Sequence, residues 1–144
     1  MKQMYSRVKL ESTDYSELDN CKILTDPDYD VLKKIYYQYC SFKKFNSVMP
    51  FFLEQYQSPN RDIIGYYDSD RLVAYSLILK YPSVNSVLGE QFAWDYTNAK
   101  LRLGIKSLEN ECALYKRLGY DYFYLGEHSE YKSKLKGYEL VKGI

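Results

Sequence analysis

Several features that would place this chain in a common class of protein are scarce or missing. It has three cysteines and one histidine in 144 residues, which leaves too few soft ligands for a zinc site. The cysteines are widely spaced and odd in number, so we expect reduced thiols. No run approaches the 18 apolar residues of a membrane span, and the polar start MKQMYSRVKLES is unlike a secretory signal. We therefore expect a cytoplasmic protein with no metal and no membrane partner.

A strong charge of one sign is also missing. Lys and Arg number 20 against 19 Asp and Glu, so the whole protein has no field that would attract nucleic acid or an anionic membrane. The chain has no internal repeat, low-complexity tract or Gly/Ser linker. A chain of this length can bury about 68–70% of its unfolded surface without disulfide or metal support. These features predict a single domain over residues 1–144.

Tyrosine is present in excess, with 18 residues. Each tyrosine has a large apolar body and a hydroxyl that needs a hydrogen-bond partner when it is buried, so tyrosines can line a polar cleft or stack on bases. Codon bias explains the same excess. Tyrosine content alone therefore predicts no function.

The first two thirds of the chain are predicted to contain helices and then strands. A short strand over 5–10 and a turn-rich loop precede an amphipathic helix over 28–45, and a second short helix lies within 47–57. Two runs rich in β-branched and aromatic residues flank the turn at 68–70, which predicts an antiparallel hairpin. A third strand follows over 86–96.

The last third predicts a helix between two strands of the same sheet. The helix runs from about 105 to 118 and stops at Gly119, and YDYFYLGE then reads as a central strand because it is apolar on both faces. GYELVKG is a last edge strand. A helical crossover makes the flanking strands parallel, so we predict an α/β (α+β) fold: a mostly antiparallel sheet with one splayed parallel pair, flanked by helices. The predicted apolar stripe of the helix is Ile105, Leu108, Cys112, Tyr115 and Leu118.

The turn into this helix is the predicted ligand site. The first backbone N–H groups of a helix are unpaired and can bind phosphate, and Gly104 lets the backbone come close to a ligand. The side chains add cationic and hydroxyl donors, each contributing about 1 kcal/mol or more to a partly buried phosphate. A tight turn with solvated charges explains the same spacing. The predicted cofactor-binding residues are Arg102, Leu103, Gly104, Ile105, Lys106 and Ser107.

Four short motifs follow one another over residues 94–132. They are Trp94-Asp95-Tyr96, Leu101-Arg102-Leu103-Gly104, Tyr122-Phe123-Tyr124-Leu125-Gly126 and Tyr131-Lys132. The order of elements resembles the GNAT acyltransferase fold, whose pyrophosphate loop carries Q/R-x-x-G-x-G/A at the equivalent turn. The motifs more closely resemble the C-terminal, GNAT-like half of the aminoacyl-tRNA-protein transferases that transfer arginine or leucine. The resemblance implies an N-acyltransferase that moves an acyl group to an amine of a small molecule or protein.

Acyl transfer to an amine needs a general base and a proton donor. Attack requires a neutral amine, so a carboxylate near the cleft is expected, and Glu90 and Asp95 are the candidates. They are an odd number of residues apart, so in a regular strand they face opposite sides. Asp95 has the closer motif match, whereas Glu90 lies where many GNAT enzymes place a base. Tyr131 is the candidate proton donor and Tyr124 the reserve; surface, capping or core roles are the alternatives.

The sequence is compatible with more than one acyl donor and more than one function. We rank acetyl-CoA or another acyl-CoA before aminoacyl-tRNA because the short chain leaves little surface for a tRNA body. A second hypothesis is a non-catalytic binding or regulatory protein, favoured by Lys106, which replaces the Gly/Ala of the loop pattern, and by the absence of an unmistakable general base. A third is an RNA-binding protein that uses tyrosine stacking and the lysines near the C-terminal end. We expect a monomer or a homodimer.

Overall fold

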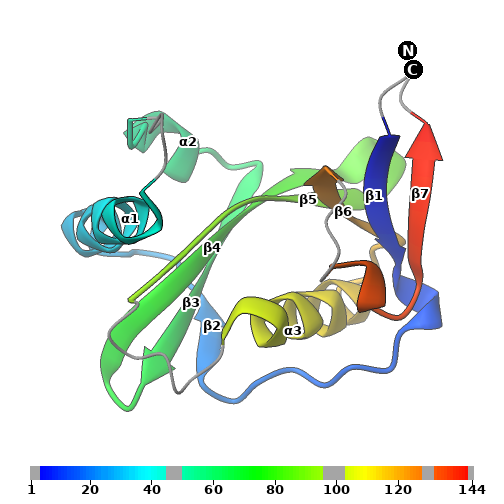
Figure 1. Cartoon of the computed structure of the whole chain (residues 1–144), viewed down its shortest axis with the longest axis horizontal. Helices are drawn as coiled ribbons and strands as arrows, with labels where there is room; N and C mark the ends of the chain where they lie inside the picture. The colour runs from blue at the N-terminus through cyan, green and yellow to red at the C-terminus, as the bar shows by residue number, and fades with distance from the viewer. Residues whose placement is uncertain (1–3, 45–49, 96–102, 128–131, 143–144) are drawn as a thin grey trace. The chain divides into compact units, whose positions relative to one another are not determined.

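The computed structural model describes residues 4–44, 50–95, 103–127 and 132–142. Its strands are β1 (Met4–Lys9), β2 (Cys21–Ile23), β3 (Arg61–Asp68), β4 (Arg71–Tyr81), β5 (Ser86–Trp94), β6 (Tyr122–Glu127) and β7 (Tyr138–Lys142). Its helices are α1 (Tyr29–Lys43), α2 (Leu53–Tyr56) and α3 (Leu103–Arg117), with short 3-10 turns η1 (Leu10–Ser12), η2 (Pro82–Val84) and η4 (Lys132–Lys134). The strands form one seven-stranded sheet in the order β2-β3-β4-β5-β6-β1-β7 (Figure 1). The sheet is mostly antiparallel with one parallel pair, which confirms the predicted fold class.

The chain divides into two compact units. The first takes in Met1–Leu18, Leu79–Glu90 and Gly104–Ile144, and the second takes in Asp19–Ile78 and Gln91–Leu103. No helix within the described residues is long and apolar enough to cross a membrane. The single domain over residues 1–144 stays a prediction.

In the first unit, β1 pairs antiparallel with a strand on each side. Val8 lies opposite Phe123 of β6 and opposite Tyr138 of β7, and a bulge interrupts the β6 pairing between Ser6 and Arg7. The start of β5 pairs parallel with β6, with Ser86 opposite Tyr122. Because parallel strands cannot be joined by a tight turn, α3 makes the connection. The predicted parallel pair is therefore confirmed.

The buried face of α3 is broader than its apolar stripe. Cys112 and Tyr115 are fully buried as predicted, but Ile105 and Leu118 are 38% and 46% exposed. The face also buries the polar Asn110, whose Oδ1 accepts a hydrogen bond of 2.6 Å from the backbone N–H of Leu18. The segment after η1 thus covers polar positions of the helix, and apolar periodicity cannot reveal such a contact.

The second unit is built on the predicted hairpin. β3 and β4 are joined by Ser69 and Asp70, and Ser69 has a left-handed φ of 57°, which fits a tight hairpin turn. β2 pairs antiparallel with β3, with Lys22 opposite Gly65. Between the predicted strand over 5–10 and the helix at 28 the sequence predicted only a turn-rich loop, so β2 was missed; three residues are too few for a periodic signal.

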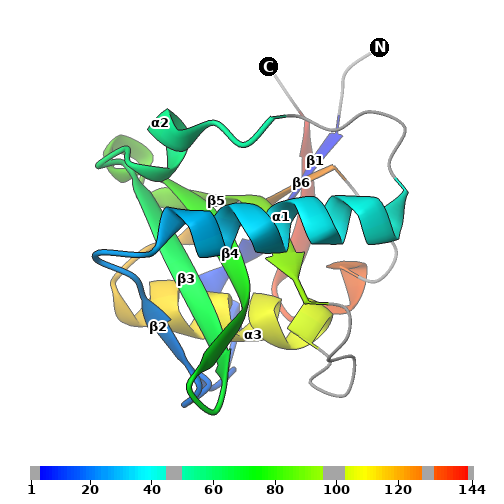
Figure 2. The same cartoon turned by 90° about the vertical axis from the view of Figure 1, so that its left-hand side faces the viewer.

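Helix α1 packs on this hairpin. Figure 2 shows α1 lying across β3 and β4. The helix begins after Asp28, whose carboxylate accepts the N–H of Asp30 at 3.0 Å, as expected of an N-cap. Helical spacing predicts an apolar face of Val31, Ile35, Tyr36, Tyr39 and Phe42, but Val31 and Phe42 are 37% and 47% exposed. The residues that α1 buries are Leu32, Ile35, Tyr36 and Cys40, and they pack with Tyr56, Ile63, Tyr75, Leu77 and Ala93.

Candidate functional site

The predicted site starts from the parallel pair of strands β5 and β6. In this pair Ser86 lies opposite Tyr122, Val87 opposite Phe123, and Leu88 opposite Tyr124. Gly89 follows directly, and a Cβ there would lie 3.2 Å from the ring of Phe123, which is tighter than ordinary van der Waals contact. The missing side chain therefore allows β5 to lie close to β6 at this point.

The first turn of α3 is open and has no negative charge. Gly104, Ile105 and Lys106 are exposed, and no atom of the described residues lies within 4 Å of the place a Cβ on Gly104 would take. The first turn contains no acidic residue. Because the N-terminal end of a helix is the positive end of its dipole and its first N–H groups lack helical partners, this turn suits an anion such as a phosphate.

Ser107 and Leu103, which were also predicted for this turn, are buried, whereas Lys106 is exposed. Ser107 is 2% exposed, and its hydroxyl donates a 3.0 Å hydrogen bond to the carbonyl of Gly104. That bond stabilises the first turn rather than pointing the hydroxyl outward. Leu103 is buried, so it can contribute only its backbone. Arg102 lies outside the described residues.

The two candidate carboxylates have very different surroundings. Glu90 is exposed on β5, whereas Asp95, just past the end of β5, is 6% exposed. Asp95 accepts a hydrogen bond from the guanidinium of Arg71, and its backbone N–H donates to the carbonyl of Val73 at 2.7 Å. An adjacent guanidinium favours the charged carboxylate and weakens it as a base. The surroundings therefore favour Glu90 as a base and give Asp95 a role in joining the end of β5 to β4.

Of the two candidate proton donors, Tyr124 lies in the middle of β6. Tyr131 is outside the described residues. Its neighbour Lys132 is half-buried and donates a hydrogen bond of 3.1 Å to the carbonyl of Leu125, and burial lowers the pKa of the Lys132 ammonium. The hydroxyl of Tyr124, the reserve donor, accepts a 3.0 Å hydrogen bond from Nη1 of Arg7, so any proton it loses would leave a phenolate beside a cation.

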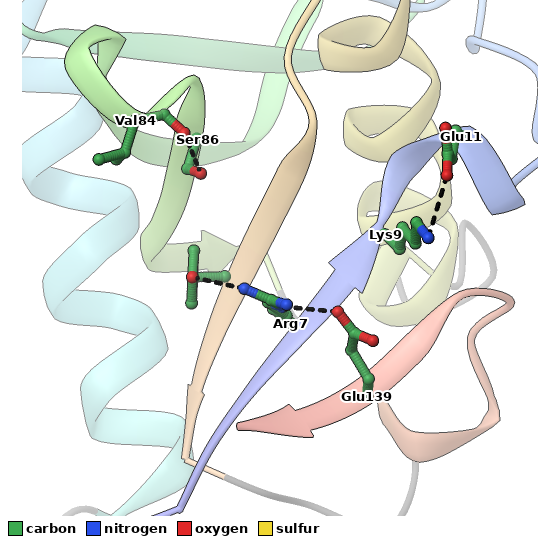
Figure 3. A network of polar contacts seen from close by, with 7 residues as sticks. Arg7, Lys9, Glu11, Val84, Ser86 and Glu139 are labelled. Carbon is green, nitrogen blue, oxygen red and sulfur yellow. Dashed lines mark hydrogen bonds and ion pairs between the residues drawn. The ribbon is translucent and has the colours of Figure 1, made fainter. Parts of the chain in front are cut away.

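Arg7 organises a polar cluster that the sequence did not reveal. Its Nε donates to Oε1 of Glu139 at 2.6 Å (Figure 3). Its guanidinium carbon lies 3.8 Å from the ring centroid of Tyr122. Tyr124 completes the cluster. Three adjacent strands supply these side chains from opposite ends of the chain, so local sequence patterns contain no sign of the cluster. A guanidinium placed in this way fixes the orientation of the tyrosines at the start and middle of β6.

The described residues contain no group of three His, Cys, Asp or Glu side chains that could hold a metal ion.

A mostly antiparallel sheet whose one parallel pair is joined by a crossing helix is the GNAT-like fold. The C-terminal domain of a protein assigned as a lysylphosphatidylglycerol synthetase from Agrobacterium fabrum matches with a TM-score of 0.66 at 11% identity, over 88% of this chain and 47% of that one. L-PGS from Bacillus licheniformis matches with a TM-score of 0.63 at 14% identity, over 88% and 47%. A protein assigned to the GNAT family of acetyltransferases from Novosphingobium aromaticivorans matches with a TM-score of 0.61 at 13% identity, over 98% and 65%.

At these identities the comparisons establish the fold. The chain spans about half the length of the first two structures, at 47% of each. No protein-family model and no curated protein sequence matches it. The GNAT-like fold is thus confirmed, and the finer resemblance to the aminoacyl-tRNA-protein transferases stays a prediction.

Proposed function

We propose that this protein is an N-acyltransferase that transfers an acyl group from acyl-CoA to an amine acceptor, a small molecule or a protein. The observation that supports the proposal is the first turn of α3, which is open at Gly104, carries the exposed Lys106 and contains no acidic residue. The GNAT-like fold supports it too, because α3 connects the parallel strands β5 and β6 of a mostly antiparallel sheet.

The donor's pyrophosphate would bind the first N–H groups of α3. The helix dipole and the ammonium of Lys106 both favour a negative group there. Ser107 would keep the turn in shape through its bond to Gly104, and Arg102 would add a second cation. Each of these roles involves a residue of the predicted cofactor-binding segment.

The chemical step would use Glu90 and Tyr131. Glu90, directly or through a water, takes a proton from the acceptor ammonium, and the neutral nitrogen attacks the thioester carbonyl. A C–N bond forms, the C–S bond breaks, and the departing thiolate takes a proton from Tyr131, while the second proton that the attacking nitrogen loses restores the Tyr131 hydroxyl. The products are the amide and free coenzyme A. Asp95, held by Arg71, would keep the end of β5 in place.

Thermal unfolding with and without acetyl-CoA tests the donor. A ligand that binds only the folded protein stabilises it by about 2.7 kcal/mol at 100 times its dissociation constant. We expect stabilisation by acetyl-CoA that Lys106→Glu abolishes. Lys34→Glu, the same charge change at an exposed lysine of α1, should leave it intact. No stabilisation of the native protein, or equal effects of the two substitutions, would contradict the proposal.

A second donor has one observation in its favour. The two structures with the highest TM-scores reported above are a protein assigned as a lysylphosphatidylglycerol synthetase and L-PGS, and the first of these names implies a lysyl product. An aminoacyl donor carried by tRNA would keep the same site and the same attack by an amine. Stabilisation by charged tRNA but not by acetyl-CoA would select this branch, and stabilisation by neither would favour a non-catalytic binding protein.

A further inference from the structure

The edge strand of the second unit, β2, presents backbone groups to an incoming strand. Among the described strands β2 lies at one end of the sheet and pairs with β3 on one side (Figure 2). Leu24 N–H donates to the carbonyl of Ile63 at 2.8 Å, and Tyr67 N–H donates to the carbonyl of Asn20 at 2.8 Å. Since hydrogen-bonded and non-bonded pairs alternate in an antiparallel ladder, the N–H and C=O of Ile23 point away from β3.

A cavity lies beside one end of this edge. It has a volume of about 340 Å³, and Leu24, Leu72 and Val31 form its apolar part. Gly65 is needed there, because a Cβ would lie 2.9 Å from Leu72 and 3.0 Å from Leu24. The missing side chain lets the two leucines pack over β3 and shape a surface that can receive one apolar side chain.

A second cavity lies beside the other end. It measures about 360 Å³ and is lined by polar residues, among them Asp19, Asn20, Ser69 and Asp70. Lys22 and Tyr67 line both cavities, and the Lys22 ammonium lies 5.2 Å from the Tyr67 ring centroid. The edge therefore has an apolar hollow toward α1 and a polar hollow toward the β3–β4 turn.

Both cavities are negatively charged. The first includes the carboxylates of Asp26 and Asp28, and the second those of Asp19 and Asp70, against the one cation Lys22 in their linings. No ion pair joins Asp19, Asp26 or Asp70 to a cation anywhere in the part of the chain that the structure describes. Unbalanced carboxylates beside an edge strand favour a partner with positive charges at both ends.

We propose that the β2 edge binds a basic segment of another protein, which adds to the sheet as an extended strand. Backbone hydrogen bonds to Ile23 give the pairing, an apolar side chain enters the cavity over Leu24 and Leu72, and basic side chains face the aspartates at the two ends. At about 3.3 Å per residue, a segment of about five residues spans both cavities. This docking goes beyond the proposed acyl transfer and does not depend on it.

The probe for the test is the capped peptide acetyl-Lys-Thr-Val-Thr-Lys-amide, with acetyl-Glu-Thr-Val-Thr-Glu-amide as its charge-reversed control. Alternation places both lysines and the valine on one face of an extended strand. Titration followed by backbone amide NMR should shift the signals of residues 19–28 with the basic peptide and leave them unchanged with the acidic one.

Two variants separate strand addition from general charge attraction. Ile23→Pro removes the outward N–H without removing a bond to β3, and edge strands tolerate proline, so it should abolish the shifts. Asp26→Lys combined with Asp70→Lys should weaken binding at least tenfold and covers the case in which the proline variant does not fold. Asp121→Lys reverses an exposed carboxylate of the first unit and controls for the effect of a charge reversal outside the β2 edge.

The proposal is overturned by equal binding of both peptides, by shifts elsewhere in the chain alone, or by binding that survives Ile23→Pro in a folded variant. A concentration-dependent dimer that Ile23→Pro disrupts would assign the edge to a second copy of this chain and would equally overturn it. Shifts confined to the β2 edge that respond to both variants support it.

Discussion

Glu90 and Asp95 are five residues apart in the sequence, yet their surroundings differ in water access and in charge. Glu90 is exposed, whereas Asp95 is buried against the guanidinium of Arg71. Both side chains end in a carboxylate. The difference in role comes from the partner and from burial.

Substituting these carboxylates should therefore affect different properties. Glu90→Gln should lower kcat/KM for acetyl-CoA-dependent acylation by about 10²–10⁴-fold, the usual contribution of a general base, with little change in stability. Asp95→Asn should lower the free energy of unfolding by about 1 kcal/mol, because the Arg71 pair is exposed on one side. Steady-state kinetics and urea unfolding measure the two effects. The reverse result, with activity lost only in Asp95→Asn, would exchange the assignments.

A substitution at Gly104 should also affect stability and ligand binding differently. A Cβ there meets nothing within 4 Å, and alanine favours a helix over glycine by about 1 kcal/mol. Gly104→Ala should therefore keep or raise stability while weakening acetyl-CoA binding, since the methyl group keeps the phosphate from the backbone. Calorimetry with acetyl-CoA tests this. Gly137→Ala is the contrasting variant, because its φ is 74° and its Cβ would lie 2.6 Å from the Lys9 carbonyl oxygen; it should destabilise without a direct effect on the donor.

At the scale of elements, α3 shows how polar contacts alter the packing of a helix. Its apolar periodicity predicts one stripe, but the segment ending at Leu18 covers Asn110 and donates a hydrogen bond to the side-chain oxygen of Asn110. A longer buried face results, while the predicted stripe residues Ile105 and Leu118 stay exposed. The helix is thus positioned from its middle, which leaves its first turn open.

Asn110→Leu tests this account of α3. The substitution introduces an apolar side chain of similar size but leaves the Leu18 N–H without its acceptor, which costs about 1–3 kcal/mol when the group is buried. Chemical unfolding should show that loss. Leu118→Asn, the reverse exchange at the exposed end of the helix, should change stability by less than about 0.5 kcal/mol. A neutral result for Asn110→Leu would mean that the hydrogen bond does not hold this segment.

At the scale of the whole chain, the net charge is close to zero, so the electrostatic interactions that matter are those between neighbouring charged side chains. Glu17 receives two hydrogen bonds from Arg117, at 2.6 Å and 3.0 Å, and these bonds lower the pKa of the Glu17 carboxyl. A carboxyl with a lowered folded-state pKa stabilises the fold above its ordinary pKa, and the stabilisation is lost as pH falls through the folded-state value.

We therefore expect stability to fall between about pH 5 and pH 2, below the ordinary pKa of 4.5 for Glu17. Glu17→Gln should reduce the slope of the unfolding free energy against pH, and added salt should reduce it in the native protein because the pair is exposed. Urea midpoints measured across this range provide the test. An unchanged slope in Glu17→Gln would assign the acid sensitivity to other carboxyls.

Local patterns in the sequence were enough to establish the hairpin, the helix between β5 and β6, and so the mixed sheet and its parallel pair. These features depend on periodicity, turn residues and the connection rules of sheets, all of which act over short stretches of chain. The open turn at Gly104 was found in the same way, since a glycine at the start of a helix is a local signal.

Tertiary structure alone decided which candidate residues have partners. Arg71 pairs with Asp95, Arg7 with Tyr124 and Glu139, and Leu18 with Asn110, at sequence separations from 24 to 132 residues. The short strand β2 and its acidic cavities likewise depend on pairing with β3 rather than on any periodic run. Such contacts have no signature in a single sequence because each residue alone fits many environments, and only the folded backbone selects the partner.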